Sequence, residues 1–319
     1  MFANSQEDYI SRYLWRRTAR APARIRRMTK LGAELKVRTN RIGRHLPTSG
    51  GFKKTLRTAW EQGLETVQIF VSNPQGWTWP RPRPDGEAFA RGAREIGLSP
   101  VVVHAKYLIN LASPDPEHRE HSVRALAAEL TAAGSLGADL IVVHPGSHMG
   151  SSEEEGVDRL VEGLAKARKL AAAEAIAAEP VIENSVGAGT QLCSTFNTLA
   201  RVAEKAGVRV CVDTAHAYVA GYDLSTPEGA RKVAAEIKAA LGERIALLHL
   251  NDPRNELGSH RDGHERIGEG RISGEAWVEI FAALPRVPVV METPYATPEV
   301  DAEQVRLVKE LAGGLLLSP

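Results

Sequence analysis

Short apolar runs alternate with longer stretches of helical periodicity along the chain after about residue 40. The runs are rich in β-branched residues, and a polar or Gly-containing break separates each from an Ala-, Leu-, Glu- and Arg-rich stretch. Two of these stretches, 120–137 and 156–176, place apolar residues at helical spacing and have Gly near an end. The pattern predicts strands that alternate with helices.

The pattern predicts eight strands. They span 41–46, 66–70, 100–105, 140–145, 180–184, 208–214, 245–250 and 287–293. Because these runs are apolar on both faces and alternate with helical stretches, we expect a parallel sheet closed into an α/β fold, a (β/α)8 TIM barrel with a basic N-terminal extension. The first run, RIGRHL, is short and charged and gives the weakest signal.

A doubly wound sheet is the alternative fold for alternating strands and helices. That fold needs a Gly-rich phosphate loop directly after an early strand. The nearest match, GEGRISG at 268–274, follows a loop instead. The barrel is therefore favoured.

Composition and cysteine usage indicate a folded, reduced protein. With 319 residues and 43% hydrophobic content the chain can bury a full-sized core, which excludes a disordered chain. Cys193 and Cys211 form no C-x-x-C pair, so neither a disulfide framework nor a thiolate zinc site is indicated. No run is long enough to span a bilayer, and the N-terminus lacks the apolar core of a signal peptide. We expect a soluble, cytoplasmic protein with no membrane partner.

Charge divides the chain into two parts. Residues 1–40 contain ten Arg or Lys against three Asp or Glu, a net +7, so the remainder carries −6 of the overall +1. Apolar residues at 9, 10, 13 and 14 have helical spacing, and Pro22 limits that run. We therefore divide the chain into a basic N-terminal arm, 1–40, and a barrel domain, 41–319. The arm is alternatively a helix docked on the barrel or a solvated tail.

Imidazoles and carboxylates stand where the predicted strands end. In a TIM barrel the carboxyl ends of all strands converge on one mouth, where catalytic groups gather. Seven such residues fall at or just after strand ends: His104, His144, Glu183, Asp213, His216, His249 and Glu292. Asp262 and His264, in the HRDGH stretch at 260–264, follow in the loop after the seventh strand.

These nine side chains predict a metal centre. A single His after an apolar run is more simply a satisfied core residue, but burying so many charges together without cations costs more than a fold tolerates. Nitrogen and oxygen ligands without Cys suit zinc or manganese at a hydrolytic site. Of the other histidines, we expect His118 and His121 on a solvated helix surface, His45 lining the mouth and His148 orienting His144, while His260 is left undecided.

Seven longer motifs carry a family resemblance. They are HAKYLINL (104–111), HPGSH (144–148), VIENSVGAG (181–189), CVDTAHAYVAGYDL (211–224), LHLND (248–252), HRDGHERIGEG (260–270) and METP (291–294). In this order and spacing the chain resembles the endonuclease IV family of DNA-repair enzymes, which are apurinic/apyrimidinic endonucleases with a three-metal centre in a TIM barrel. The resemblance covers residues 41 to about 312.

The resemblance implies a ligand set for three zinc ions, with Mn²⁺ as an alternative at one or more sites. The first ion would be held by His104, His144 and Glu183; the second by Glu183, Asp213, His249 and Glu292; the third by His216, Asp262 and His264. Glu183 is the implied catalytic residue, because it ligates two ions and positions the attacking water. The implied reaction cleaves the phosphodiester 5′ to an abasic site, leaves a 3′ hydroxyl and a 5′ deoxyribose phosphate, and extends to removal of 3′ blocking groups.

The implied partner is double-stranded DNA with abasic sites or blocked 3′ ends, bound by a monomer. Tyr107 and Leu108 match the family's DNA-inserting positions, although packing at the barrel rim is an equal alternative. Gln75 stands where the family commonly has an inserting Arg, and Gly263 where a basic residue often precedes the last His. The basic arm is expected to add contacts to DNA phosphates.

Two other functions remain in view. A metal-dependent sugar isomerase or epimerase of the xylose isomerase-like type shares the barrel but needs only one or two metals, so the surplus ligands His104, His144 and His264 argue against it. A DNA-damage binder without turnover would keep the barrel, but the complete ligand set argues against that function too.

Overall fold

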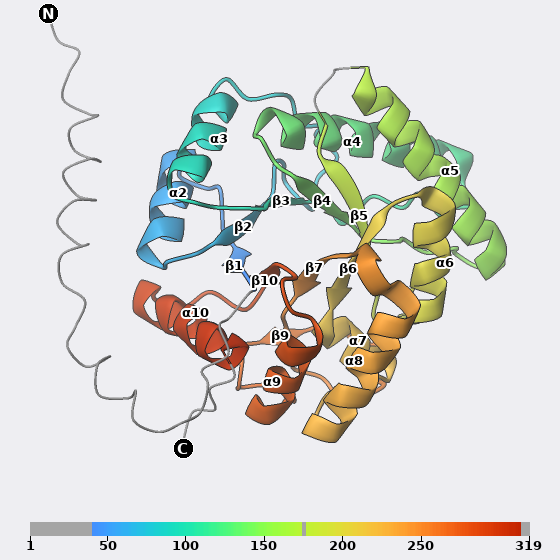
Figure 1. Ribbon diagram of the computed structural model, residues 1–319. Helices are drawn as coiled ribbons and strands as arrows, with labels where there is room; N and C mark the ends of the chain where they lie inside the picture. The colour runs from blue at the N-terminus through green and yellow to red at the C-terminus, as the bar shows by residue number, and fades with distance from the viewer. Residues whose placement is uncertain (1–39, 174–176, 314–319) are drawn as a thin grey trace, which may run out of the picture. The chain divides into compact units, whose positions relative to one another are not determined.

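The computed structural model describes residues 40–173 and 177–313. Eight parallel strands close into a barrel in the order β1-β10-β7-β6-β5-β4-β3-β2, with helices around it (Figure 1). This arrangement confirms the (β/α)8 prediction and excludes the doubly wound alternative. The basic arm predicted at 1–40 lies, except for Asn40, outside the described residues, so its role remains a prediction.

All eight predicted strands are present. The barrel strands are β1 (Ile42–His45), β2 (Thr66–Ile69), β3 (Val101–His104), β4 (Leu140–Val143), β5 (Glu179–Glu183), β6 (Arg209–Asp213), β7 (Ile245–His249) and β10 (Val289–Met291). The loop after β7 contains a small antiparallel pair that the pattern did not predict, β8 (Asp252–Pro253) with β9 (His264–Glu265). That pair fixes both ends of the segment that carries HRDGH.

The helices lie outside the strands. They are α2 (Phe52–Glu61), α3 (Gly86–Glu95), α4 (Pro116–Ser135), α5 (Glu153–Ala172), α6 (Phe196–Ala206), α7 (Thr214–Ala220), α8 (Pro227–Leu241), α9 (Gly274–Ala283) and α10 (Pro298–Ala312), with a 3-10 turn at Gly242–Arg244. Seven of them begin at a Ser, Thr or Asp whose side chain accepts a backbone N–H of the first turn. Among the described residues, no helix has the length and apolarity that a membrane crossing requires.

The inner layer of the barrel explains why the site residues face the mouth. Eight small or branched side chains fill the barrel interior: Val102, Leu140, Val142, Val181, Cys211, Ala246, Leu247 and Val290. Side chains two residues apart on a strand point to the same face. Six site residues stand two positions after a member of this layer: His104, His144, Glu183, Asp213, His249 and Glu292. The strands therefore direct all six inward, just above the apolar layer.

The charged first strand is also accounted for. Arg44, at the centre of β1, is 1% exposed, and its Nη1 lies 2.8 Å from Asp301 Oδ1 on α10. Its guanidinium also lies over the ring of Tyr295, 5.2 Å from the centroid. Because an ion pair and an aromatic face satisfy this cation, β1 forms despite its weak apolar signal.

Candidate metal centre

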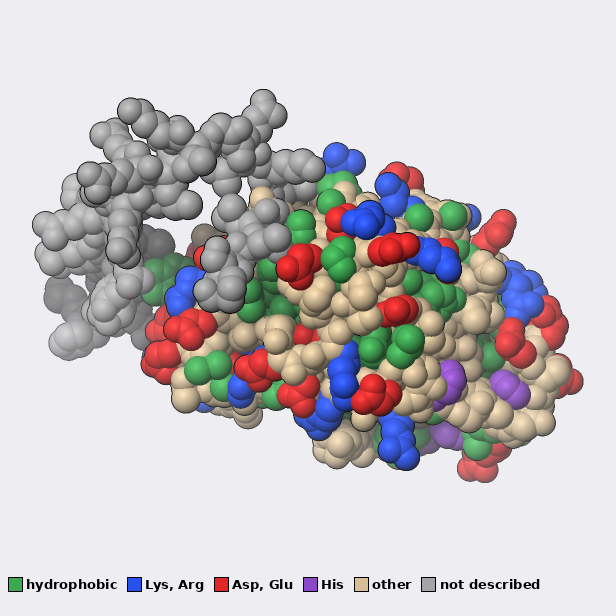
Figure 2. All heavy atoms as spheres, turned by 90° about the horizontal axis from the view of Figure 1, so that it is seen from below, with side chains coloured by type: hydrophobic (Ala, Val, Ile, Leu, Met, Phe, Trp, Pro, Cys, Tyr) green, Lys and Arg blue, Asp and Glu red, His purple; other side chains and the backbone are tan. Residues whose placement is uncertain are grey.

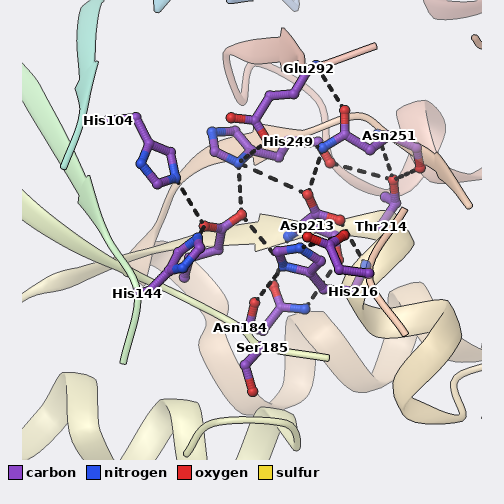
Figure 3. A network of polar contacts seen from close by, with 12 residues as sticks. His104, His144, Asn184, Ser185, Asp213, Thr214, His216, His249, Asn251 and Glu292 are labelled. Atoms are coloured by element: carbon purple, nitrogen blue, oxygen red, sulfur yellow. Dashed lines mark hydrogen bonds and ion pairs between the residues drawn. The ribbon is translucent and has the colours of Figure 1, made fainter. Parts of the chain in front are cut away.

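The predicted ligands come together at the mouth in three overlapping groups (Figure 3). The groups are His104 with His144 and Glu183; Glu183 with Asp213, His249 and Glu292; and Asp213 with His216 and His264. Within each group all ligand atoms lie within 4.8 Å of one another. Asp262 reaches the third group from an exposed loop: its Oδ1 lies 3.5 Å from His216 Nε2 and 3.3 Å from His264 Nε2.

The spacing of the donor atoms fits shared cations. Two ligands bound at 2.0–2.1 Å to one tetrahedral zinc ion are separated by roughly 3.3 Å. Glu183 Oε2 lies 3.1 Å from His144 Nε2 and 3.6 Å from His104 Nε2. Within the described ranges, Glu183 Oε2 and His264 Nε2 are moreover buried without a hydrogen-bond partner, a state that a polar atom rarely keeps unless an ion or water satisfies it. The residues present therefore fit metal ions.

Three histidines are held in the tautomer that a metal requires. His104 Nδ1 donates to the carbonyl of Ala105 at 2.7 Å, and His216 Nδ1 donates to the carbonyl of Asn184 at 2.9 Å. His249 Nε2 donates to Gln68 Oε1 at 2.8 Å. In each ring the other nitrogen faces a carboxylate of the cluster, with its lone pair available to a cation.

Amide side chains hold the carboxylates in place. Asn251 Nδ2 donates to Asp213 Oδ2 at 2.6 Å and to Glu292 Oε2 at 3.2 Å, while Gln68 Nε2 donates to Glu292 Oε1 at 2.6 Å. Asn184 bonds the backbone N–H and C=O of Asp213. Sequence reasoning missed these three amides. Their signals were a lone polar residue within the apolar run TVQIF and an Asn directly after VIE and close behind LHL.

The electrostatics of the cluster call for positive charge. Burial alone would raise the pKa of Glu183, but the imidazoles of His249, His104 and His144 hold it well below its usual range. Burial alone would lower the pKa of His216, but the charge of Asp213 and the hydrogen bond to Asp262 raise it well above its usual value. The buried carboxylates therefore stay ionised only beside positive charge. Protonated imidazoles supply that charge in the absence of metal, and bound metal ions would supply it otherwise.

Cys211 lies next to this network although sequence reasoning assigned it no role. Its sulfur, Glu183 and His249 offer ligand atoms within 4.8 Å of one another. Burial raises the pKa of the Cys211 thiol to about 12, so it stays protonated at neutral pH. A protonated thiol is a poor metal ligand. Nitrogen and oxygen atoms therefore dominate the donor set, as the sequence indicated.

The structure corrects the view of two other histidines. His118 and His121 lie on α4, as predicted, but they are half-buried against Trp77 rather than solvated. Trp79 Nε1 also bonds His121 Nε2 at 3.3 Å. The aromatic residues of the segment after β2 cover both rings, and the helical pattern of α4 could not show this.

Three further histidines surround the site. His45 lines the mouth, where its Nδ1 accepts from Gln68 Nε2 at 3.1 Å and burial lowers its pKa to about 4. Among the described residues no hydrogen bond joins His148 to His144, and the buried Nδ1 of His148 has no hydrogen-bond partner there, so the predicted orienting role for His148 is not seen. His260, left undecided by the sequence, bonds the carbonyl of Val186 through Nδ1 at 2.8 Å.

The residues expected to contact DNA lie at the rim of the mouth. The Tyr107 side chain is 48% exposed, and its ring lies 5.4 Å from that of His104 and 5.6 Å from that of His144. Leu108 is half-buried and Gln75 is exposed. A cavity of about 230 Å³ opens beside them, lined by Tyr107, Asn110, Ser147, Ser185, His216 and Asp262 among others.

Gly263, one of the two departures from the family pattern, has a local explanation. A Cβ at this position would lie 2.9 Å from Nδ2 of Asn255. That amide donates to the carbonyls of Arg261 and Asp262, at 3.1 and 3.3 Å. Asn255 therefore occupies the space that a larger residue at position 263 would need.

Comparisons with known proteins agree with this geometry. Residues 56–311 match the family described as xylose isomerase-like TIM barrel. A probable endonuclease 4 of Methanoculleus marisnigri is 37% identical over 280 residues, which cover 85% of this chain and 99% of that protein. A probable endonuclease 4 of Chloroflexus aurantiacus is 38% identical over 265 residues, which cover 80% of this chain and 91% of that protein.

A solved structure gives the same result. The crystal structure of endonuclease IV from Thermus thermophilus superimposes with a TM-score of 0.75 at 34% identity, over 85% of this chain and 98% of that one. Identity at this level over nearly the whole of each relative establishes common descent as well as a common barrel. The chain belongs to the endonuclease IV family of xylose isomerase-like TIM barrels.

Proposed function

We propose that this protein is a metal-dependent apurinic/apyrimidinic endonuclease that hydrolyses the phosphodiester 5′ to an abasic site in double-stranded DNA. The supporting observation is the set of three overlapping ligand groups, two of which share Glu183 and two Asp213. A one-metal or two-metal sugar isomerase has no need of the third group. The proposal takes the protein to act as a cytoplasmic monomer.

Nine residues would hold the metals, with zinc the expected ion and Mn²⁺ an alternative. His104, His144 and Glu183 would hold the first ion; Glu183, Asp213, His249 and Glu292 the second; His216, Asp262 and His264 the third. Bound ions would supply positive charge against the extra negative charge of the pentacovalent transition state and would lower the pKa of the attacking water.

The chain's own residues set the geometry of this chemistry. Glu183 Oε1 faces His249 Nδ1 at 2.7 Å, while Oε2 faces His144 and His104 at 3.1 and 3.6 Å. The attacking water would therefore be positioned on that side of Glu183. The third group, His216, Asp262 and His264, lies toward the other carboxylate oxygen, since His216 Nδ1 is 3.6 Å from Glu183 Oε1, and the leaving 3′ oxygen would be received there. The expected products are a 3′ hydroxyl and a 5′ deoxyribose phosphate, and blocked 3′ ends would be trimmed by the same arrangement.

The rim of the mouth suits a macromolecular substrate. Of the six large hydrophobic side chains that are exposed in the described part of the chain, five lie on loops that follow barrel strands: Trp79, Tyr107, Met149, Leu257 and Tyr295. A sugar would be enclosed by its pocket and would not require an exposed apolar rim. We propose that Tyr107, Leu108 and Gln75 contact DNA at the lesion, where a missing base makes unstacking least costly.

The test combines metal analysis with incision of a duplex that carries one abasic analogue. Glu183→Gln should keep the fold and lose orders of magnitude in rate, because it removes charge from two metal sites at once. Glu179→Gln is the matched control: it lies on the same strand, at the opposite end, in an exposed ion pair with Arg209. Wild-type incision by Glu183→Gln would contradict the assignment. Ketose epimerisation without incision by the wild-type protein would favour the sugar isomerase instead.

A further inference from the structure

The segment that joins β2 to α3 has an unusual composition for this barrel. Residues 71–84, VSNPQGWTWPRPRP, contain two Arg, four Pro and no acidic residue, whereas the chain beyond residue 40 carries a net −6. Arg81 is exposed and makes no hydrogen bond or ion pair within the described ranges. The Trp79 side chain is 41% exposed. The exposed indole of Trp79 and the exposed guanidinium of Arg81 are thus two residues apart on one loop.

The buried ammonium group of Lys106 holds this segment in place through hydrogen bonds to its backbone. Lys106 is 2% exposed, and its Nζ donates to the carbonyls of Gly76 and Thr78 at 2.9 and 2.8 Å. The same ammonium lies 3.6 Å from Glu129, whose carboxylate also accepts from Ser72 Oγ at 2.6 Å. The prolines restrict φ along the rest of the loop. The conformation of the segment is therefore set before any ligand binds.

An imidazole fixes the orientation of the two indoles. The Trp77 ring lies on that of His121, with centroids 4.4 Å apart and planes at 31°. His121 Nε2 also bonds Trp79 Nε1 at 3.3 Å. The polar edge of Trp79 is thereby satisfied by the protein, while its exposed face is free to stack. A preorganised aromatic ring loses little conformational entropy on binding.

The segment adjoins the metal centre. The backbone N–H of Tyr107 donates to the carbonyl of Pro74 at 3.1 Å, and the Tyr107 ring is in turn 5.4 Å from His104. A polymer that crosses the mouth at Tyr107 therefore passes directly onto residues 74–81. A small substrate held among the metal ligands would not reach them.

We propose that Trp79 and Arg81 form a secondary binding site for DNA next to the cleaved bond, in which Trp79 stacks on an unstacked base and Arg81 contacts a backbone phosphate. The inference deepens the proposed function and rests on it. Exposed aromatic rings beside cations are the usual means of holding single-stranded nucleic acid, because every base has a π-face and every nucleotide a phosphate. Because the chain beyond residue 40 carries a net −6, it repels DNA phosphates overall, and a local cation such as Arg81 is needed to offset that repulsion.

The test measures the Kd of the full-length protein for a labelled abasic duplex and for single-stranded oligothymidylate. Trp79→Ala should weaken binding to both by roughly tenfold, and Trp79→Phe should restore most of that loss, because stacking survives in a phenyl ring. Arg81→Gln should reduce the log–log salt dependence of Kd by about 0.9. Leu170→Ala on α5 is the control, since it removes an equally exposed apolar side chain from an outer helix. Hydrolysis of bis(p-nitrophenyl) phosphate should be unchanged in all four variants.

The outcomes separate this inference from the proposed function. If the wild-type protein incises abasic DNA but Trp79→Ala binds both probes as tightly as the wild type, the secondary site is overturned and the endonuclease stands. If Trp79→Ala weakens oligothymidylate binding while the wild-type protein fails to incise, the endonuclease is overturned and the site stands. An equal loss of affinity in Leu170→Ala would also overturn the site.

Discussion

Gln68 determines which nitrogen of His249 faces the ligand cluster. Its Oε1 accepts from His249 Nε2, and its Nε2 donates to Glu292 Oε1, so a flipped amide would set its oxygen against a carboxylate. His249 Nδ1 is left with a lone pair 2.7 Å from Glu183 Oε1. Two acceptors remain this close only if a proton or a metal ion lies between them.

Gln68→Met should therefore lower metal affinity without preventing folding. Loss of the hydrogen bond that orients a metal-binding imidazole typically weakens metal affinity about 10- to 100-fold. Competition with a zinc-binding dye measures the effect. Gln62→Met provides the control, because Gln62 is also nearly buried but lies at the end of α2, away from the mouth. Equal metal affinity in Gln68→Met and the wild type would show that Gln68 does not orient His249.

The sequence predicted the proposed metal ligands well, but it did not predict the residues that hold the ligands and the adjoining loop in place through hydrogen bonds. His104 and Glu183 could be predicted because ionisable residues stand at the ends of several apolar strands at once, and burying so many of them together requires cations. Gln68, Asn251 and Lys106 are neutral amides or an ordinary cation, and their importance depends on which backbone or side-chain atoms happen to lie nearby. Only folding creates those contacts, so the local sequence could mark Gln68 and Asn251 as polar residues beside apolar runs but could not show which groups they would bond.

Among the loops, the one after β7 is organised by a single carboxylate. Asp252 is fully buried, and its two oxygens accept the backbone N–H groups of Gly268, Gly270, Arg271 and Ile272 at 2.8–3.1 Å. A Cβ at position 270 would lie 2.2 Å from Asp252 Oδ1, which explains the glycine there. These bonds close the loop that holds two of the proposed ligands.

Asp252→Asn should destabilise the fold by about 2–4 kcal/mol, because a buried amide NH2 would then face backbone donors. It should also release the metal of the third group while the first group keeps its own. Thermal unfolding and metal-to-protein stoichiometry measure the two effects. Asp223→Asn is the control, since Asp223 makes a similar but exposed turn with Ser225. Full metal content in Asp252→Asn would show that the loop holds its shape without the carboxylate.

Strands were easier to predict than the shorter elements between them. The inner layer of small branched residues requires apolar runs, and those runs are visible in any window of the sequence. The pair β8–β9 has two residues in each strand, Asp252–Pro253 and His264–Glu265, which carry no β-strand signal at all. The short helix α7 begins at Thr214, directly after β6, without the polar break that marks the others. Tertiary contacts, rather than periodicity, specify both.

At the scale of the whole molecule, the metal-free and metal-bound proteins should respond to pH in opposite ways. Without metal, the pKa values of His216 and His264 are raised, because nearby carboxylates outweigh the lowering effect of burial. A raised pKa in the folded state stabilises the protein below the ordinary value of 6.5, and that stabilisation is lost as pH rises through the folded-state pKa. Metal binding instead requires neutral imidazoles and strengthens with pH.

Chelated protein should therefore show a Tm that falls as the pH rises above 6.5, whereas zinc-loaded protein should show a Tm that is level or rises over the same range. Differential scanning calorimetry of both forms in one buffer series makes the comparison. Parallel curves for the two forms would contradict the view that imidazolium ions replace the metals in the empty cluster.

The charge of residues 1–40 is a second feature of the whole molecule. Figure 2 shows one face of the barrel on which Lys and Arg are interspersed with Asp and Glu, so that face presents no broad cationic surface. Deleting residues 1–38 should leave metal content and hydrolysis of a small phosphodiester unchanged. It should weaken duplex binding and flatten its log–log salt dependence by several units, at roughly 0.9 for each phosphate that the arm neutralises. An unchanged salt dependence would show that the arm does not touch DNA.

Closure of the barrel also determines when the protein can become active during synthesis. β1 pairs with β10, so the first and last strands of the sheet, at Ile42 and Val289, are neighbours. Glu292 is the last of the nine proposed ligands. Until the ribosome has released β10, β1 and β7 keep unpaired edges, which are sites of aggregation. The complete centre therefore forms only after β10 has left the ribosome, and a chain cut short before residue 289 has neither a closed barrel nor a complete centre.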